Sequence, residues 1–280
     1  METKISEAIK RGKLVRKRLI KTVERAVTVD TTDVYPHTYI YSPPGLGKTH
    51  TVNSHLDKMG VEHYEISGAM SMFAFGVSLA VIRYNRPTGK IIINVDDCDG
   101  IFKNEENINI MKNVLSGSRT FTYNKSVKTL LTQYSELQQA AVEHFSSEEQ
   151  VGFSVPTNDL VFIFTSNFSL PTDDEAAQAS QKGGTRNIRK VHLNAIRSRC
   201  KTVDFELDQI THFGWLADVC LNENLVPTVS DEVKEDMLIF ILTNWSKMTE
   251  RSIRTLEKMA QVANDEPEDY KLVWELDFLK

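Results

Sequence analysis

Ser42-Pro43-Pro44-Gly45-Leu46-Gly47-Lys48-Thr49 is the stretch that decides the fold of this chain. It lies between a short β-rich run, His37 to Tyr41, and a segment, Lys48 to Met59, predicted to be a helix ended by Gly60. Glycines allow successive backbone N–H groups to turn toward phosphate oxygens, and the N-terminus of a helix favours negative charge. A strand, such a loop and a helix in this order predict a phosphate-binding loop.

Within this loop, we expect Lys48 to reach the outer phosphates of a nucleotide and the Thr49 hydroxyl to bind Mg²⁺. Ser42 departs from the pattern GxxxxGK[ST], because it stands where the first glycine belongs. Gly47-Lys48-Thr49 is intact, which favours nucleotide binding over a chance Gly/Pro turn. The residues assigned to nucleotide binding are Pro44, Gly45, Leu46, Gly47, Lys48, Thr49 and His50.

A second motif, Ile91-Ile92-Ile93-Asn94-Val95-Asp96-Asp97, is an apolar strand that ends in two adjacent carboxylates. At the carboxyl end of a central parallel strand these acids would face the phosphate site. We therefore expect Asp96 to hold the water shell of Mg²⁺ and Asp97 to orient or deprotonate the attacking water. The alternative is a strand end followed by an ordinary acidic turn, DDCDG.

Strands and helices alternate outward from these motifs, which predicts a parallel sheet covered by helices on both faces. The predicted strands are 61–66, 90–95, 160–165 and 202–206, and the predicted helices are 72–84, 106–115 and 188–196. Between them we expect a β-hairpin with arms 119–123 and 151–155 around a helical insertion at 127–145, and a flexible loop at 171–186. Residues 208–222, 230–245 and 249–264 are predicted to be helices of a separate all-helical domain with an acidic tail.

Charge is distributed unevenly along the chain. An amphipathic first helix is predicted from Ile5 to Val27. Residues 1–25 carry nine Lys or Arg against three Glu, so the net charge of −5 for the whole chain leaves −11 for the rest. This basic helix could bind nucleic acid, contact a neighbouring subunit or simply be solvated, and the last two are favoured.

The overall composition is that of an ordinary globular protein. The 280 residues are 41% hydrophobic, 25% charged and 9% aromatic, which excludes collagen-like, coiled-coil and wholly disordered classes. Three cysteines without CxxC spacing predict neither a disulfide framework nor a zinc site. No apolar run approaches the roughly 20 residues that cross a bilayer, and the N-terminus lacks a signal-peptide core, so we expect a cytoplasmic protein without a membrane partner.

Taken together, the motifs resemble those of the AAA+ ATPase family, over nearly the whole chain after Thr38. PPGLGKT is similar to the phosphate loop of that family and IIINVDD to its acidic strand, although the second acid there is usually Glu and here is Asp97. VFIFTSN resembles the strand of the first sensor, which implies that Asn167 polarises the attacking water.

Two further segments of the chain resemble arginine motifs of the family. AIRSRC resembles the SRC segment of clamp-loader relatives, which implies that Arg199, or its competitor Arg197, completes the active site of a neighbouring subunit. ERSIRTLEK resembles the second-sensor helix, which implies that Arg254, with Arg251 as its competitor, contacts the γ-phosphate in its own subunit.

The resemblance implies an α/β P-loop core with a five-stranded parallel sheet, followed by an α-helical lid. The expected domains are a basic N-terminal helix at 1–30, the ATPase core at 31–207 with its insertion at about 118–157, and the lid at 208–280. The expected activity is hydrolysis of ATP with Mg²⁺ at the subunit interfaces of a homo-oligomeric ring. A hexamer is the expected stoichiometry, and an incomplete or helical ring is the alternative. The compact chain resembles the small AAA+ proteins of phages and mobile elements.

Three classes of function remain open at this point. The first is an ATPase that loads or remodels something on DNA, in replication or another DNA transaction. The second is a protein-remodelling or threading ATPase, for which Phe73 and Phe75 could form an aromatic pore loop and the hairpin could project toward a client, although two such Phe are more often core. The third is an ATP-gated assembly switch with slow hydrolysis, which Asp97 in place of Glu would favour.

Overall fold

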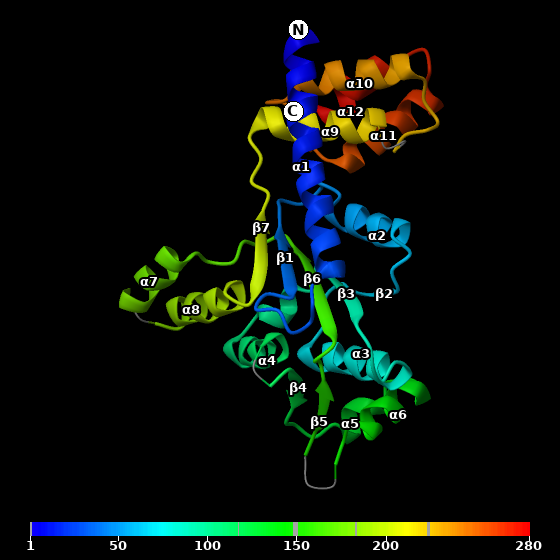
Figure 1. Cartoon of the computed structure of the whole chain (residues 1–280). Helices are drawn as coiled ribbons and strands as arrows, with labels where there is room; N and C mark the ends of the chain where they lie inside the picture. Colours follow the sequence, from blue (N-terminus) through cyan, green and yellow to red (C-terminus); the bar gives the residue numbers. More distant parts are fainter. Residues whose placement is uncertain (1, 117, 148–150, 183, 223–224) are drawn as a thin grey trace. The chain divides into compact units, whose positions relative to one another are not determined.

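The computed structural model describes residues 2–116, 118–147, 151–182, 184–222 and 225–280. These residues form two compact units (Figure 1). Unit 1 comprises residues up to 21, residues 42–51 and residues 205–280, and unit 2 comprises residues 22–41 and 52–204. Helices α1 (Glu2–Thr28) and α2 (Lys48–Lys58) contribute residues to both units. The domains 1–30, 31–207 and 208–280 stay a prediction.

Unit 2 is built on a five-stranded parallel sheet in the order β2-β3-β6-β1-β7, which confirms the predicted α/β architecture. Its strands are β1 (His37–Tyr41), β2 (His63–Ser67), β3 (Ile91–Asp96), β6 (Leu160–Ser166) and β7 (Cys200–Asp204). Every residue of β6 is buried, as expected of a central strand covered on both faces. The carboxyl ends of β3 and β6 lie side by side, because Asp96 is in register with Thr165.

Helices and one short hairpin complete unit 2. The helical segments are the 3₁₀ helix η1 (Asp99–Phe102) and α3 (Met72–Asn85), α4 (Glu105–Leu115), α5 (Lys128–Leu131), α6 (Glu136–His144), α7 (Asp173–Lys182) and α8 (Thr185–Arg197). Strands β4 (Thr120–Tyr123) and β5 (Phe153–Pro156) pair antiparallel, which confirms the predicted hairpin; residues 148–150 of its predicted insertion lie outside the described residues.

Phe73 and Phe75 of α3 belong to the hydrophobic core, which removes the pore-loop interpretation. Their side chains are buried, and the Phe73 ring packs against Tyr134 and Phe153. The hairpin covers the same helix: a Cβ on Gly76 would lie 2.2 Å from the Phe121 ring, so only glycine permits this approach.

One prediction in unit 2 was wrong. Residues 173–182 of the predicted loop form α7, because Thr172 and Glu175 exchange capping hydrogen bonds and Ala176 and Ala179 bury one face. The polar composition concealed good helix formers, Ala and Gln. The helical stretch predicted at 127–145 consists of two helices, α5 and α6, because Ser135 forms a capping box with Gln138 and starts a new helix.

The helices of unit 1 are the first part of α1 together with α9 (Gln209–Asn222), α10 (Asp231–Asn244), α11 (Ile253–Asp265) and α12 (Tyr270–Phe278). The expected acidic tail is wrong in part, since α12 is a fourth helix whose Trp274 is fully buried and donates to the Met259 carbonyl at 3.0 Å. No helix in the described part of the chain is both long and apolar enough to span a membrane.

Helices α1 and α9 cross so closely that their backbones are in van der Waals contact. A Cβ on Gly214 would lie 1.7 Å from the Ala8 carbonyl oxygen, and a Cβ on Gly12 would lie 2.2 Å from the Gly214 carbonyl. Beside this crossing, the Arg16 guanidinium lies 3.8 Å from the buried Asp218 carboxylate. Part of the basic charge of α1 therefore faces its own unit rather than a partner.

Candidate functional site

The phosphate loop in unit 1 has the backbone that its glycines predict. Gly45 and Gly47 have φ angles of 86° and 66°, in the left-handed region that side chains with a Cβ rarely adopt. The Thr51 N–H donates to the Gly47 carbonyl at 2.9 Å, which starts the hydrogen bonding of α2 directly after the loop. The loop therefore adopts a backbone that glycine permits at both positions, and its binding of phosphate stays a prediction.

Lys48 is held against this loop. Its side chain is buried, with 7% of the residue exposed, and its Nζ donates to the Ser42 carbonyl at 2.9 Å and to the Pro43 carbonyl at 3.4 Å. The Ser42 side chain is fully buried and donates to the Pro43 carbonyl at 2.9 Å. A serine is therefore accommodated where the motif has its first glycine.

The remaining residues assigned to nucleotide binding differ in exposure. Pro44 and His50 are exposed, Thr49 is half-buried at the start of α2, and Leu46 is buried. Leu46 and Lys48 border a small apolar hollow together with Leu19 of α1 and Trp215 of α9. The loop is thus anchored in unit 1 by apolar contacts.

The start of α11 contacts the phosphate loop directly. The Ile253 N–H donates to the Gly45 carbonyl at 2.9 Å, and a Cβ on Gly45 would lie 2.4 Å from the Ser252 Cβ. Arg254, the predicted second sensor, is exposed at this helix start. Sequence reasoning missed Ser252 and Ile253; Ser252 has the signature of a helix N-cap, but that signature does not reveal its contact.

In unit 2, the structure brings Asp97 together with Asn167. Asp97 follows β3 with a φ of 49°, and its N–H donates to the Thr165 carbonyl at 3.1 Å. The Asn167 side-chain Nδ2 donates to Asp97 Oδ1 at 2.8 Å, and the Thr165 hydroxyl donates to the Asp96 carboxylate. Two predicted catalytic residues from neighbouring strands therefore share one hydrogen bond.

Ser166 and Asp99 also belong to this polar cluster, and the sequence did not predict them as site residues. The Ser166 hydroxyl donates to Asp99 Oδ1 at 2.6 Å, so the third acid of DDCDG also has a hydrogen-bond partner at the end of β6.

Burial, and then the charges of the neighbouring acids, raise the pKa of the Cys98 thiol to about 12. Cys98 therefore stays protonated at neutral pH and cannot act as a thiolate nucleophile. All three cysteines are buried and unbridged.

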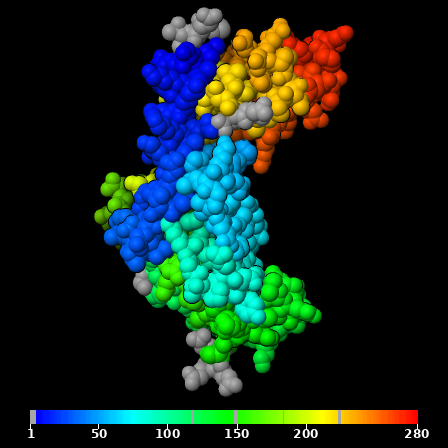
Figure 2. Space-filling model, turned by 45° about the vertical axis from the view of Figure 1, so that its right-hand side comes forward, coloured from blue at the N-terminus to red at the C-terminus, as the bar shows by residue number. Residues whose placement is uncertain are grey.

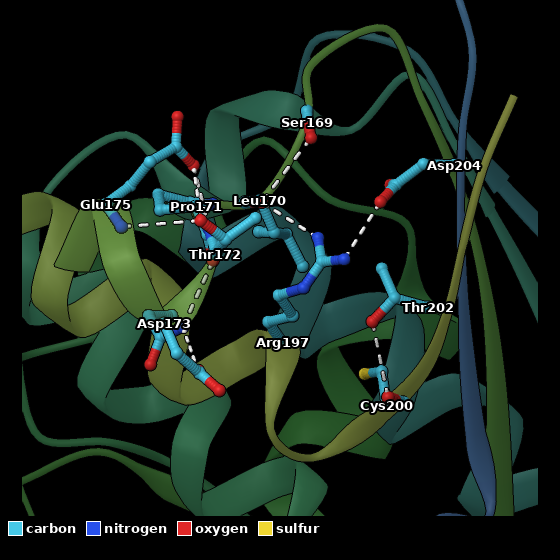
Figure 3. Close-up of polar contacts among 11 residues, drawn as sticks. Ser169, Leu170, Pro171, Thr172, Asp173, Glu175, Arg197, Cys200, Thr202 and Asp204 are labelled. Atoms are coloured by element: carbon cyan, nitrogen blue, oxygen red, sulfur yellow. Dashed lines mark hydrogen bonds and ion pairs between the residues drawn. The ribbon is translucent and has the colours of Figure 1, made fainter. Parts of the chain in front are cut away.

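The Arg197 guanidinium binds two groups of its own chain, as Figure 3 shows. Its Nη2 lies 2.9 Å from Asp204 Oδ2 in an ion pair, and its Nη1 donates to the Leu170 carbonyl at 3.0 Å. These contacts join α8, β7 and the loop after β6. Arg197 therefore has a structural task that explains its presence without a role in a neighbouring active site.

Arg199 has a different environment. Its Nε donates to the Ser116 hydroxyl at 2.7 Å and its Nη1 to the Ala195 carbonyl at 2.5 Å, and within the described part of the chain no carboxylate pairs with it. Burial lowers the pKa of Lys112, and the positive charge of Arg199 lowers it further. The role of Arg199 in a neighbouring active site stays a prediction.

The chain was compared with curated proteins, with solved structures and with models of protein families. No curated protein matches the chain. The structure is similar to that of the Orc1 protein of Aeropyrum pernix in complex with DNA, with a TM-score of 0.45, 11% sequence identity and coverage of 91% of this chain. This chain spans 60% of the length of that protein. The model of the family described as "ATPase family associated with various cellular activities (AAA)" matches residues 38–180, just over half of the chain. The chain belongs to this AAA family of ATPases.

Proposed function

We propose that the chain hydrolyses ATP with Mg²⁺ as a subunit of a homo-oligomeric ring, and that turnover drives loading or remodelling on DNA. The observation that carries the proposal is the hydrogen bond between Asn167 and Asp97, because it unites the acid and the polar residue that ATP hydrolysis requires. The DNA part rests on the likeness of Ser198-Arg199-Cys200 to the SRC segment of clamp loaders.

Each residue has one role in this proposal. Lys48 and the loop N–H groups bind the phosphates, and Arg254 contacts the γ-phosphate. Asp97 accepts the proton of the water whose oxygen bonds to the γ-phosphorus as the bond to the ADP oxygen breaks, and Asn167 orients the Asp97 carboxylate and that water. Arg199 of one subunit offsets negative charge on the γ-phosphate held by the next.

The donor set fits Mg²⁺. Mg²⁺ prefers oxygen ligands and keeps several of its waters, and Thr49 and Asp96 supply a hydroxyl and a carboxylate. The described residues contain no group of three or more His, Cys, Asp or Glu able to hold a metal without other ligands. Mg²⁺ bound with the nucleotide would neutralise phosphate charge.

Calorimetry with ATP and a phosphate-release assay on the full chain test this proposal. Lys48→Ala should abolish tight ATP binding, because it removes the cation that faces the outer phosphates. Lys58→Ala, in the last turn of the same helix, is the matched control and should bind ATP normally. Unchanged ATP affinity of Lys48→Ala would contradict the proposal.

The DNA part is tested separately by adding duplex DNA to the same phosphate-release assay. Stimulated turnover supports a DNA-directed role, whereas stimulation only by a protein client favours remodelling of proteins. Because Phe73 and Phe75 are core residues, the threading alternative no longer has an aromatic pore loop in its favour.

A second candidate function is an ATP-gated assembly switch. Asp97 is one methylene shorter than the Glu that is usual at this position of the family, which favours slow hydrolysis. Assembly that requires ATP, with no phosphate release over many hours, would support the switch against the hydrolase.

A further inference from the structure

The outer face of α1 carries a stripe of lysines around one exposed leucine. This basic stripe consists of Lys10, Lys13, Leu14, Lys17 and Lys21. The residues recur at three- and four-residue intervals, so they share one face of the helix. All are exposed, Leu14 to 69%, and none of the four lysines has a hydrogen bond or ion pair within the described part of the chain.

The packing of α1 explains why this face points outward. Ala8, Gly12 and Leu19 are buried, and the first two meet α9 at Gly214. The basic stripe lies half a turn away from these residues. Unit 1 therefore buries one side of α1 and leaves the lysines on the opposite side exposed.

A stripe of opposite charge lies on α12 and the two residues before it, in the same unit. This acidic stripe consists of Glu268, Asp269, Leu272, Glu275 and Leu276. Leu272 and Leu276 are 59% and 74% exposed, while Trp274 and Phe278 anchor the opposite face of the helix. No side chain of its three acids is paired within the residues the structure describes. Residues 208–280 as a whole carry fifteen acidic against seven basic side chains.

The two stripes are complementary in three respects. Their charges are opposite, each contains exposed leucine, and each runs along about two to three turns of helix. Figure 2 shows α1 in blue and the red C-terminal segment on opposite sides of unit 1, with α9 and α10 between them. One chain cannot bring the stripes together, but two copies can.

We infer that the basic stripe of one chain docks onto the acidic stripe of a second copy, in a head-to-tail contact. Such a contact uses two different surfaces and therefore closes into a ring or continues as a helix. The inference rests on the proposed oligomer and names one of its contacts. A stable interface buries about 800 Å² per partner, so this helix pair adds to the interface that carries Arg199.

Nucleic acid is the competing partner for the basic stripe. Phosphates would bind the lysines, but they would leave Leu14 exposed at the centre of the stripe, and they would leave the acidic stripe and its two leucines unexplained. A second copy covers all of these residues.

The test is sedimentation of the full chain with Mg²⁺ and a non-hydrolysable ATP analogue, using two charge reversals. Lys13→Glu/Lys17→Glu and, separately, Glu268→Lys/Glu275→Lys should each raise the dissociation constant of assembly about tenfold or more. An equimolar mixture of the two variants should assemble again, because each subunit then offers its neighbour an opposite charge. Lys58→Glu/Lys128→Glu changes the net charge equally at exposed positions outside the stripe and should assemble like the wild type.

The outcomes separate this inference from the proposed ring. If the wild type assembles and Lys13→Glu/Lys17→Glu assembles equally well, the contact is wrong while the ring stands. If that variant also loses affinity for duplex DNA in an anisotropy titration, the stripe is a nucleic-acid surface instead. A wild type that stays monomeric under these conditions overturns both. Assembly lost in each variant and not restored in the mixture also overturns the contact, since the stripes then do not meet.

Discussion

Asn167 and Asp97 share a hydrogen bond of 2.8 Å although they lie 70 residues apart in the chain. The pair exists because β6 is the neighbour of β3 in the sheet, so their carboxyl ends present side chains to the same edge. Asp97 holds a left-handed φ of 49°, and its N–H is tied to the Thr165 carbonyl. The backbone and the side chain of Asp97 are thus both positioned by β6 and the residue after it, which is the fixed orientation that its proposed role requires.

Asp97→Asn should stop ATP turnover without unfolding the chain. Asn adopts the left-handed region as readily as Asp, so we expect the melting temperature to stay close to that of the wild type. Loss of the base should reduce phosphate release at least about 100-fold while ATP affinity is retained. Phosphate release at the wild-type rate would show that Asp97 is not the base.

Gly45→Ala should destabilise the phosphate loop and its contact with α11. The new Cβ would meet the Ser252 Cβ at 2.4 Å, in addition to the strain of about 1–2 kcal/mol for a left-handed residue. Gly60→Ala is the matched control, since Gly60 also has a positive φ, of 64°, but nothing lies within 4 Å of its Cβ position. Urea unfolding and ATP titration of both variants measure the two effects. Equal losses in the two variants would argue against a tight contact with Ser252.

Arg199→Ala should cripple turnover while each subunit still binds ATP. The arginine finger contributes about three to five orders of magnitude in other P-loop enzymes. Mixing Arg199→Ala subunits with Lys48→Ala subunits should recover part of the activity, because some interfaces then join an intact phosphate loop to an intact finger. No recovery in mixed rings shown to form would count against action between subunits.

Arg197→Ala is the comparison for this experiment and should behave differently. It removes the ion pair with Asp204 and the hydrogen bond to the Leu170 carbonyl, so it should lower the stability of the fold. Thermal melting separates this loss from a catalytic one. If the mixture with Lys48→Ala recovers activity for Arg197→Ala but not for Arg199→Ala, the finger is Arg197.

His37 should make the stability of the fold depend on pH. Burial, and then the charge of Arg119, lower the pKa of His37 from 6.5 to about 3, and its Nδ1 accepts the Phe162 N–H at 3.2 Å. The unfolded chain therefore binds a proton that the folded chain refuses. Stability is complete above about pH 6.5 and falls as the pH drops toward 3, by up to about 1.4 kcal/mol per pH unit.

Urea unfolding at pH 7.5 and 5.5 measures this effect against His37→Gln, which keeps a hydrogen-bond acceptor but does not titrate. The wild type should lose about 1 kcal/mol more than the variant between these two pH values. The same loss in both proteins would assign the pH dependence to other groups.

The sequence by itself was sufficient for the fold class and the phosphate loop. Gly45 and Gly47 were predicted to turn the backbone toward phosphate, and both have the positive φ that this requires. The five parallel strands were located to within about two residues, because an apolar run bounded by turn residues is a local signal. The loop expected at 171–186 was wrong, because its polar composition concealed the local signals of α7, namely the capping residues Thr172 and Glu175 and the buried Ala176 and Ala179.

Only the tertiary structure decided which side chains meet. The sequence named Asp97 and Asn167 from their motifs, but the order of strands, with β6 beside β3, determines that Asn167 reaches Asp97. Likewise, the contact of Ile253 with Gly45 joins segments about 200 residues apart and has no local signature. Backbone conformation follows from sterics between near neighbours, which a motif records, whereas side-chain partnership follows from long-range packing, which a single sequence does not.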